Sequence, residues 1–415
     1  MTNMDRQFPI GFWNYTPVGW YGPETVQDWK DCGMTVAISP RFHPDQCRKE
    51  DLLKILDESY RLGIRVIVSD DRTYWHGAAQ DPEAYRQRVR EAYADFGRHP
   101  AVFGFHVGDE PTFQAIDEAI LAYRIHLEVA PELTPFINFL PCPADLDTKW
   151  ALYAENFDSF ADRFASAAGL KLLCYDHYTQ MLPEESGIES YFLDLRQYME
   201  AAKRLQLPLW TTLLSVGHYR YRCPTEDDLR WQLNTAVASG CKGILWFYFY
   251  LNGAPINYRV PPIDELGEKT ETYRWLSRTL RIFAKKFGPT MAGLDHLSTY
   301  HFVKSYGGYP IFRHNTDPYV YSVSSEHGLP GMLSFFRGQE GDLYIAMVNT
   351  SQKESGVFKV LFQPQVSQVF HLVWDGTEKD VSTCGQDAFY AVQDGKILSG
   401  TWLAPGQMEL FRIRC

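Results

Sequence analysis

Two adjacent acids, Asp109 and Glu110, stand where a short apolar run ends, in the stretch FGFHVGDEP. Neighbouring carboxylates repel each other when both are ionised, so one of the two tends to keep its proton near neutral pH. A protonated carboxyl can donate that proton to a leaving group. The pair therefore predicts acid–base chemistry with Glu110 as the proton donor. The alternative is structural, because acids also cap the helix that follows a strand.

The elements that must position this pair can be found from the hydrophobic pattern. Short apolar runs recur through the first two-thirds of the chain and predict strands, while charge-rich amphipathic stretches between them predict helices. Pro111 is expected to end the fourth strand and to hold Glu110 in extended geometry. Thr225, followed by three acids, predicts the N-cap of the helix before the last strand. The predicted strands are Phe8–Tyr15, Met34–Ser39, Ile64–Ser69, Val102–Val107, Thr134–Phe139, Lys171–Asp176, Pro208–Leu214 and Gly243–Tyr250.

Eight strand–helix units predict an α/β fold, a (β/α)8 TIM barrel over residues 1–296. A doubly wound sheet is the alternative, but the stretch NYTPVGWYGP after the first strand lacks the GxGxxG turn of that fold. From about Leu297 onward, short alternating runs separated by turn residues predict a C-terminal antiparallel β-sandwich domain over residues 297–415. A length of 415 residues also favours two domains.

Composition excludes several classes of partner. The chain has 40 basic and 51 acidic side chains, a net charge of −11 without long single-sign blocks, which argues against nucleic acid and an anionic membrane surface. Eight cysteines lie far apart without CxxC pairs, and no leader-like segment is present, so reduced thiols and a cytoplasmic location are predicted. No metal or other cofactor is predicted, because no HExxH-like spacing occurs. The oligomeric state is left open, a homo-oligomer included.

In a barrel, chemistry is done by residues at the carboxyl ends of the strands. Here those positions carry acids, amides and aromatic rings. Such a mixture suits a carbohydrate, because carboxylates and amides hydrogen-bond hydroxyls while ring faces cover the C–H surface of a pyranose. The substrate-binding residues predicted from these positions are Asp71, His106, Asn138, Asp176, Tyr178, Trp246 and Tyr248.

The stretch HPAVFGFHVGDEP resembles the fourth-strand segment of (β/α)8-barrel glycoside hydrolases, where "HPAV.G" leads to the general acid/base. The likeness covers the barrel loosely and extends to INFLP after strand five and to a C-terminal sandwich. In the largest such clan, this resemblance implies that Glu110 is the acid/base and that a nucleophilic Glu ends strand seven. This sequence departs from that pattern, because the segment from Leu205 to Cys223 contains no carboxylate.

His106, Gly108, Asp109 and Glu110 also resemble the Asp-Glu motif of β-N-acetylhexosaminidases, in which the substrate's own 2-acetamido oxygen attacks the anomeric carbon. This resemblance implies that Asp109 orients the acetamide and Glu110 is the acid/base. It also implies that a tyrosine holds the acetamide oxygen and that tryptophans enclose its methyl group, roles for which we expect Tyr178, Trp210 and Trp246. The expected activity is that of an exo-acting β-N-acetylhexosaminidase, for N-acetylgalactosamine or N-acetylglucosamine, using substrate-assisted retaining catalysis.

Two alternatives remain open. One is an ordinary two-carboxylate β-glycosidase, for example β-galactosidase-like, with Asp176 or Asp71 as the second acid. The other is a barrel that binds carbohydrate without cleaving it. An intact acid pair argues against the latter, because a like-charge pair is costly to keep without a use for it.

Overall fold

The structure is a computed structural model that describes residues 7–141, 157–183, 186–251, 257–385 and 388–415. The chain forms two compact units, neither of which is a single continuous segment. Unit 1 comprises the chain up to Tyr178 together with Gln197–Cys223 and Gly243–Ser277, and unit 2 comprises Thr179–Arg196, Pro224–Lys242 and Arg278–Cys415. The predicted boundary at residue 297 lies close to the first antiparallel strand of unit 2, which begins at Asp295.

Unit 1 is built on parallel strands, and all eight predicted strands are present in its described residues, most of them shorter than predicted. They form two four-stranded parallel sheets with the strand orders β1-β9-β7-β6 and β2-β3-β4-β5. The strands are β1 (Ile10–Phe12), β2 (Val36–Ile38), β3 (Arg65–Val68), β4 (Val102–Asp109), β5 (Phe136–Asn138), β6 (Leu173–Asp176), β7 (Leu209–Leu214) and β9 (Gly243–Phe247). A separate two-stranded ribbon pairs β8 (Gly217–His218) with β10 (Tyr258–Arg259).

Hydrogen bonds link the edges of the two parallel sheets. Between β5 and β6, the Phe139 N–H donates to the carbonyl of Cys174 at 2.8 Å, and the Asp176 N–H donates to the carbonyl of Phe139 at 3.3 Å. Between β1 and β2, the Thr35 N–H donates to the carbonyl of Ile10 at 2.8 Å. The two sheets are therefore continuous through their edges, and the carboxyl ends of β4, β5 and β6 are brought side by side.

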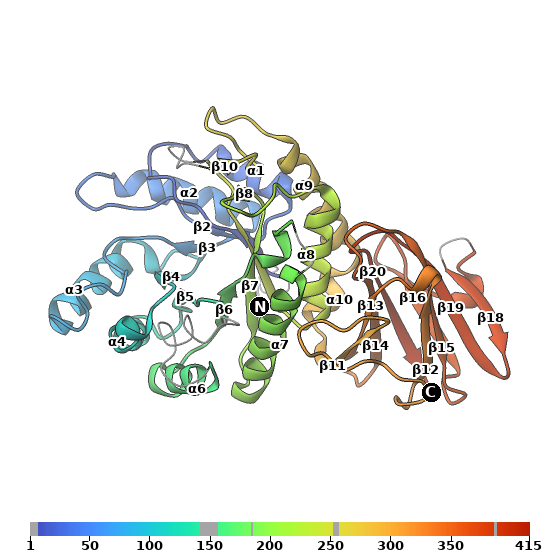
Figure 1. Ribbon diagram of the computed structural model, residues 1–415. Helices are drawn as coiled ribbons and strands as arrows, with labels where there is room; N and C mark the ends of the chain where they lie inside the picture. The colour runs from blue at the N-terminus through green and yellow to red at the C-terminus, as the bar shows by residue number, and fades with distance from the viewer. Residues whose placement is uncertain (1–6, 142–156, 184–185, 252–256, 386–387) are drawn as a thin grey trace. The chain divides into compact units, whose positions relative to one another are not determined.

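The helices of unit 1 follow the strands and lie to their outside (Figure 1). Glycines in left-handed geometry end α1 and α2, Gly33 at φ 97° and Gly63 at φ 73°, as expected where only glycine avoids a Cβ clash. Asp81 caps α3 by accepting from the Ala84 N–H. The bounds are α1 (Thr25–Cys32), α2 (Lys49–Leu62), α3 (Pro82–Ala92), α4 (Ile116–Val129) and α6 (Phe157–Ala168), while α7 (Ser186–Leu205) and α9 (Glu271–Lys286) each contribute residues to both units.

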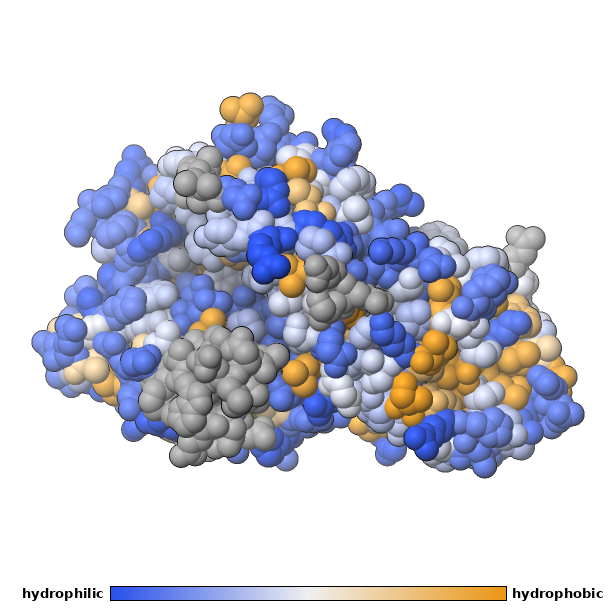
Figure 2. Space-filling model, viewed as in Figure 1, coloured by the Kyte–Doolittle hydropathy of each residue, from blue (hydrophilic) through white to orange (hydrophobic). Residues whose placement is uncertain are grey.

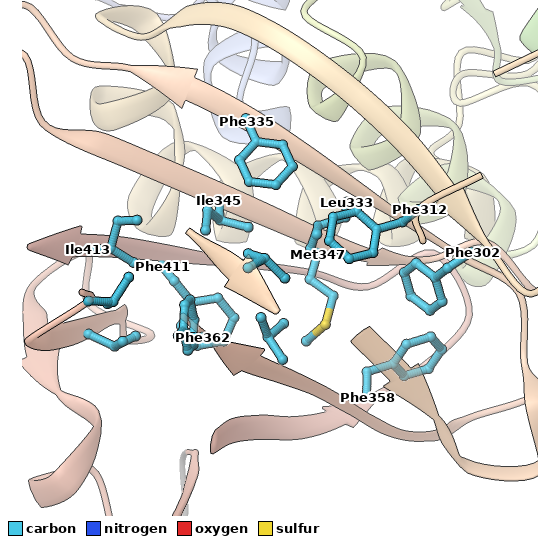
Figure 3. Packing of buried hydrophobic residues seen from close by; sticks show 14 of the residues in the cluster. Phe302, Phe312, Leu333, Phe335, Ile345, Met347, Phe358, Phe362, Phe411 and Ile413 are labelled. Carbon is cyan, nitrogen blue, oxygen red and sulfur yellow. The ribbon is translucent and has the colours of Figure 1, made fainter. Parts of the chain in front are cut away.

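Unit 2 contains two antiparallel sheets with the orders β11-β13-β14-β20-β16-β17 and β12-β15-β19-β18. One hydrophobic cluster joins them, with Leu333, Met347 and Phe411 from the first sheet and Phe358 and Phe362 from the second (Figure 3). The strands are β11 (Asp295–Phe302), β12 (Val320–Ser325), β13 (Gly331–Arg337), β14 (Leu343–Asn349), β15 (Gly356–Phe362), β16 (Gln368–Leu372), β17 (Glu378–Asp380), β18 (Phe389–Gln393), β19 (Lys396–Leu403) and β20 (Met408–Arg414).

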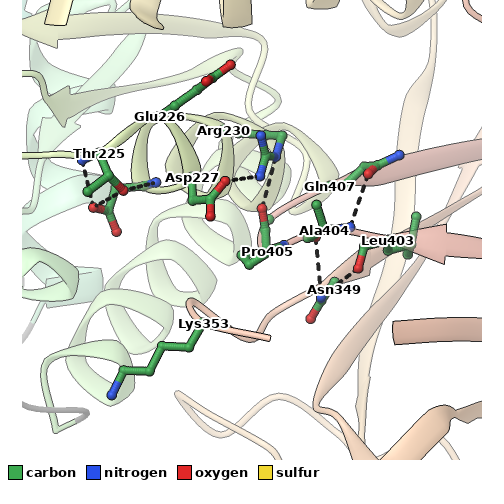
Figure 4. Close-up of polar contacts among 12 residues, drawn as sticks. Thr225, Glu226, Asp227, Arg230, Asn349, Lys353, Leu403, Ala404, Pro405 and Gln407 are labelled. Carbon is green, nitrogen blue, oxygen red and sulfur yellow. Dashed lines mark hydrogen bonds and ion pairs between the residues drawn. The ribbon is translucent and has the colours of Figure 1, made fainter. Parts of the chain in front are cut away.

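Helix α8 (Glu226–Ala238) belongs to unit 2, as does the short α10 (Gly288–Ala292). The predicted N-cap is confirmed: the Asp228 N–H donates to the Thr225 hydroxyl, and the Asp228 carboxylate accepts from the Thr225 N–H, a capping box. Arg230 then donates to the carbonyl of Pro405 at 2.9 Å, which ties the helix to the turn before β20 (Figure 4). Unit 2 is therefore a sheet-based body with a helix bonded to one of its turns.

The outer face of the four-stranded sheet in unit 2 is apolar over part of its area. Trp402 of β19 is 63% exposed and pairs with Val357 of β15, which is half-buried. Figure 2 shows apolar side chains gathered over these C-terminal strands.

Candidate active site

A β-bulge in β4 decides which way the acid pair points. His106 pairs with Phe136 of β5, but the next pair is Gly108 with Ile137, so β4 contains one extra residue at this place. Strict alternation would put Asp109 on the opposite face from His106. The bulge instead aligns Asp109 with Asn138, the inward residue two positions after Phe136, so both His106 and Asp109 face the interior of unit 1.

Glu110 does not have the extended geometry expected from the proline after it. Its φ is +49°, in the left-handed region that residues other than glycine rarely occupy. The Glu110 N–H donates to the Asn138 carbonyl at 2.9 Å, so the register with β5 fixes the backbone just where β4 ends. This expectation was wrong because pairing with the neighbouring strand outweighed the local preference. Unusual backbone geometry of this kind is concentrated at functional sites.

Three carboxyl groups meet at the ends of β4 and β6, and we call Asp109, Glu110 and Asp176 the acid cluster. The amide of Asn138 donates to Asp109 Oδ1 at 3.1 Å and to Asp176 Oδ1 at 2.9 Å. The carboxyls of Glu110 and Asp176 are close enough to shift each other's pKa. Two ionised carboxylates repel each other, which favours a proton on one of the two.

Burial and mutual repulsion make the acid cluster hold protons at unusually high pH. Burial raises the pKa of Asp109 to about 7, with repulsion from Glu110 adding to the effect and the Asn138 amide opposing it. Burial also raises the pKa of Glu110, against the lowering effect of Asp176. The pKa of Asp176 lies well above its usual range, because of burial first and then the charges of Glu110 and Asp109. A carboxyl that stays protonated near neutral pH can serve as a general acid.

Tyrosines surround the acid cluster. Burial raises the pKa of the Tyr15 and Tyr178 hydroxyls well above the usual value, and the acid cluster raises both further. Tyr74 accepts a hydrogen bond from the Asp109 N–H at 3.3 Å, and its pKa is raised to about 12 by burial and by Asp109. These hydroxyls remain neutral donors at neutral pH. Tyr178 was among the predicted site residues, whereas Tyr15 was not. The sequence signal for Tyr15 was its position two residues after Trp13, because alternate residues of an extended segment face the same side.

A cavity of about 460 Å³ adjoins the acid cluster at Asp109. Trp13 forms part of its wall, held by a hydrogen bond from its indole N–H to the Thr212 hydroxyl at 3.0 Å and stacked on Tyr15. His106 is neutral at physiological pH, because burial lowers its pKa to about 4. The cavity is lined by Trp13, Asn14, Tyr15, Ile38, Arg41, Ser69, Asp70, Asp71, Tyr74, His76, Arg88, His106 and Asp109. Its size and mixed polar and aromatic lining suit one or two sugar rings.

Asp71 lines this cavity without joining the acid cluster. It forms ion pairs with Arg41 at 2.5 Å and with His43 at 2.6 Å. Its neighbour Asp70 is buried and paired with Arg72 at 2.8 Å. Both carboxylates are thus occupied by cations of the protein, unlike the members of the acid cluster.

The structure does not bring the two predicted tryptophans to this site. Trp210 is the second residue of β7 and stacks on Phe103, the second residue of β4, so it lies toward the amino ends of the strands, away from the acids. Trp246 is fully buried and pairs in register with Phe12, whose ring packs on Trp29 of α1. Its side chain therefore faces outward from the parallel strands.

The aromatic residues after Trp246 lie nearer the acids. The Phe247 ring contacts Tyr15 and Tyr178 at centroid distances of 6.0 and 5.5 Å. Tyr248, a predicted site residue, is buried and lies 6.0 Å from Tyr15. Phe247 and Tyr248 are adjacent in sequence and both lie near Tyr15, so strict alternation does not hold at the end of β9.

The described part of the chain shows neither a cluster of metal ligands nor a membrane-spanning helix. No group of three or more His, Cys, Asp or Glu side chains there is arranged to hold a metal ion. None of its helices is long and apolar enough to cross a membrane.

Comparison with known proteins places the fold among glycoside hydrolases. No family model matches the chain, and no curated protein matches it by sequence. The structure is similar to a GH42 β-galactosidase from G. stearothermophilus, with a TM-score of 0.65 and 11% identity over 99% of this chain and 98% of that one. It is also similar to a family 39 glycoside hydrolase from Bacteroides cellulosilyticus WH2, with a TM-score of 0.57 and 12% identity over 100% and 82% of the two chains.

A β-galactosidase from the psychrophilic Marinomonas ef1 is similar over 66% of this chain, with a TM-score of 0.50 and 12% identity. This chain spans only 59% of that enzyme's length. At identities this low, the likenesses establish a shared fold and leave the chemistry to be argued from the residues of the site.

Proposed function

We propose that this protein is a glycoside hydrolase, and the observation that carries the proposal is the acid cluster at the ends of β4 and β6. Glycosidic hydrolysis needs a carboxyl that keeps its proton until the leaving oxygen takes it. Glu110 fits that role, since it is accessible to solvent and partial burial raises its pKa, against the lowering effect of Asp176. The fold shared with glycoside hydrolases supports the same reading.

We further propose that the two parallel sheets of unit 1 form one closed (β/α)8 barrel and that the two sheets of unit 2 form a β-sandwich. The links at Phe139 and Thr35 join the sheet edges in the cyclic order expected of a barrel. The single hydrophobic cluster shared by both antiparallel sheets supports the sandwich. On this view the acid cluster lies at the carboxyl end of the barrel, where such enzymes have their active sites.

The lack of a carboxylate between Leu205 and Cys223, the segment that contains β7, favours participation by the substrate. Retaining enzymes with two carboxylates hold them about 5 to 5.5 Å apart across the anomeric carbon, and inverting enzymes hold them further apart. The end of β7 provides no second carboxylate to place at such a distance from Glu110. A 2-acetamido sugar supplies its own nucleophile and needs no second carboxylate there.

The proposed reaction proceeds in two steps. Glu110 gives its proton to the glycosidic oxygen while the acetamide oxygen bonds to the anomeric carbon and the bond to the leaving group breaks. Glu110 then removes a proton from water, whose oxygen bonds to the anomeric carbon as the acetamide oxygen leaves, so the product retains its configuration. Asp109 accepts from the acetamide N–H, and Tyr178 donates to the acetamide oxygen. The substrate is accordingly a terminal β-linked N-acetylhexosaminide.

A second candidate is a two-carboxylate β-glycosidase in which Asp176 is the second acid. The presence of Asp176 within the acid cluster favours it, because this residue already faces Glu110. Asp71 is the weaker choice for the second acid, since its carboxylate already contacts Arg41 and His43.

Release of nitrophenol from β-glycosides with and without the 2-acetamido group tests both candidates. Cleavage confined to N-acetyl sugars, and lost in Glu110→Gln and Asp109→Asn, is expected for substrate participation. Equal cleavage of plain galactosides or glucosides, with loss in Asp176→Asn, would establish the two-carboxylate mechanism instead. Sugar binding without any turnover would identify a non-catalytic barrel.

A further inference from the structure

The cavity beside Asp109 contains a cation that the protein leaves without an acidic partner. Arg88 of α3 lines the cavity, and its guanidinium lies over the Tyr85 ring at 5.3 Å. One terminal nitrogen, Nη2, donates to the His76 carbonyl at 3.1 Å. In the part of the chain that the structure describes, Arg88 makes no ion pair, and its buried Nε has no hydrogen-bond partner.

Two neighbouring arginines, unlike Arg88, have acidic partners. Arg72 is paired with both Asp70 and Asp95 at 2.8 Å. Arg86, on the same helix as Arg88, forms ion pairs with Glu83 and Glu128. A partly buried guanidinium is costly unless it is paired, so Arg88 differs from these two arginines and also from Arg41, which lines the same cavity but is paired with Asp71.

From this placement we propose that the sugar bound in the cavity carries an anionic group, a carboxylate or a sulfate ester, that Arg88 binds. The inference rests on the proposed glycosidase function and specifies its substrate class. Nη1 has no acceptor among the described residues, and a planar guanidinium presents paired donors that match the oxygens of a carboxylate or sulfate.

The surrounding groups are consistent with an anion at this end of the cavity. Tyr85, beneath the guanidinium, is itself held by a hydrogen bond from its hydroxyl to the Thr73 carbonyl at 2.8 Å, so the position of Arg88 is supported from below. The acids of the same wall, Asp70 and Asp71, are neutralised by Arg72 and Arg41. Of the charged groups in this lining, Arg88 and Asp109 are therefore the ones without an ion-pair partner among the described residues.

Paired substrates test the proposal and separate the two anions. We would compare 4-nitrophenyl β-glucuronide with the β-glucoside, and the N-acetyl-β-glucosaminide 6-sulfate with its unsulfated parent. The expected result is a preference for one anionic member, with kcat/KM falling as ionic strength rises because charge attraction is screened. In Arg88→Gln the preference, measured as the ratio of kcat/KM for the anionic and neutral members of a pair, should drop on the order of 10- to 100-fold.

Two variants control for structure. Arg88→Lys keeps the charge and should recover part of the preference and all of its salt dependence. Arg90→Gln removes a charge from the exposed last turn of the same helix, outside the cavity, and should leave the preference unchanged. Equal cleavage of neutral and anionic members, or equal losses in Arg88→Gln and Arg90→Gln, would overturn the proposal.

Binding separates failure of this inference from failure of the proposed function. Calorimetry of Glu110→Gln with glucuronate and with N-acetylglucosamine 6-sulfate requires no turnover. Binding of either anion that is lost on adding Arg88→Gln supports the anion site even if no glycoside is cleaved. Absence of binding by both, in a protein that cleaves neutral glycosides, would refute the anion site and leave the glycosidase standing.

Discussion

The acid cluster of unit 1 and Glu409 of unit 2 are both buried carboxyl groups, but their neighbours shift the pKa in opposite directions. Glu409 is almost fully buried, and its carboxylate meets Lys286 at 2.5 Å and His371 at 2.6 Å. Burial alone would raise the pKa of Glu409, but the Lys286 charge and the hydrogen bond with His371 lower it below the usual value. In the acid cluster, carboxyls instead face other carboxyls and an amide, and their pKa values rise.

The contrast separates a carboxylate that stabilises the fold from carboxyl groups that can exchange a proton. An acid matched by cations is permanently ionised and stabilises the fold around it. An acid matched by acids exchanges its proton near neutral pH and costs stability, which is the usual compromise at active sites. This difference arises from the side-chain partners, which at the acid cluster are set by the bulge in β4.

The largest effect is expected from Glu110→Gln. The variant removes the proposed proton donor without changing the shape of the side chain, so kcat/KM should fall by on the order of 10³-fold. Stability should stay the same or increase, because a repelling carboxyl is lost. Steady-state kinetics and urea unfolding would check both quantities. A variant that is fully active would show that the acid cluster does not do the chemistry.

Glu409→Gln should reverse that pattern. Lys286 and His371 would be left buried without their common anion, so the free energy of unfolding should fall by about 3 to 5 kcal/mol. Turnover per folded molecule should be unchanged. Glu378→Gln is the matched control, since the Glu378 side chain is 27% exposed against 4% for Glu409, and a partly exposed pair is worth about 1 kcal/mol or less. Equal destabilisation by Glu409→Gln and Glu378→Gln would show that the buried position of Glu409 gives its pairing no special role in stability.

The pH dependence of stability should have opposite signs at the two places. The folded-state pKa of Asp109 is about 7, above the unfolded value near 3.9, so the folded protein binds the extra proton between these values. Its contribution to stability is therefore present at low pH and is lost as the pH rises through about 7. Glu409, with its lowered pKa, contributes stability above its unfolded pKa that is lost on acidification.

Urea unfolding of wild type and Asp109→Asn from about pH 4.5 to 7.5 would test the first sign. The variant should gain stability relative to wild type as the pH rises through that range. A constant difference would mean that Asp109 has an ordinary pKa in the folded protein.

The smallest effect is expected from Tyr178→Phe. Loss of one neutral donor beside the acid cluster should lower kcat/KM by about tenfold, with unfolding nearly unchanged. Tyr390→Phe, on an exposed strand of unit 2, should have no effect on kcat/KM. If both variants behave alike, the Tyr178 hydroxyl takes no part in the reaction.

Much of the fold could be predicted because it depends on local pattern. Every predicted parallel strand is present, and the Thr225 cap is confirmed. Both could be predicted because period-two alternation and helix capping depend on only a few consecutive residues. The division of the chain into two units was harder to predict from the sequence. The segments 179–196 and 224–242 group with the C-terminal part, and no composition shift marks them.

The candidate site was predictable where strand ends alone fix it, as for Asn138 and Asp176. It was not predictable where partners lie far apart in sequence. The bulge beside Gly108, the left-handed geometry of Glu110 and the outward direction of Trp246 all depend on register with a neighbouring strand.

The sequence by itself determined the elements and the presence of an acid pair at the end of the fourth strand, because hydrophobic periodicity and residue type are local properties. Only the tertiary structure decided that Asp176 and Asn138 would meet that pair, that Asp71 would be neutralised and that Arg88 would not. Protonation and pairing depend on desolvation and on distances of a few ångströms between residues far apart in the chain, and no local pattern encodes those distances.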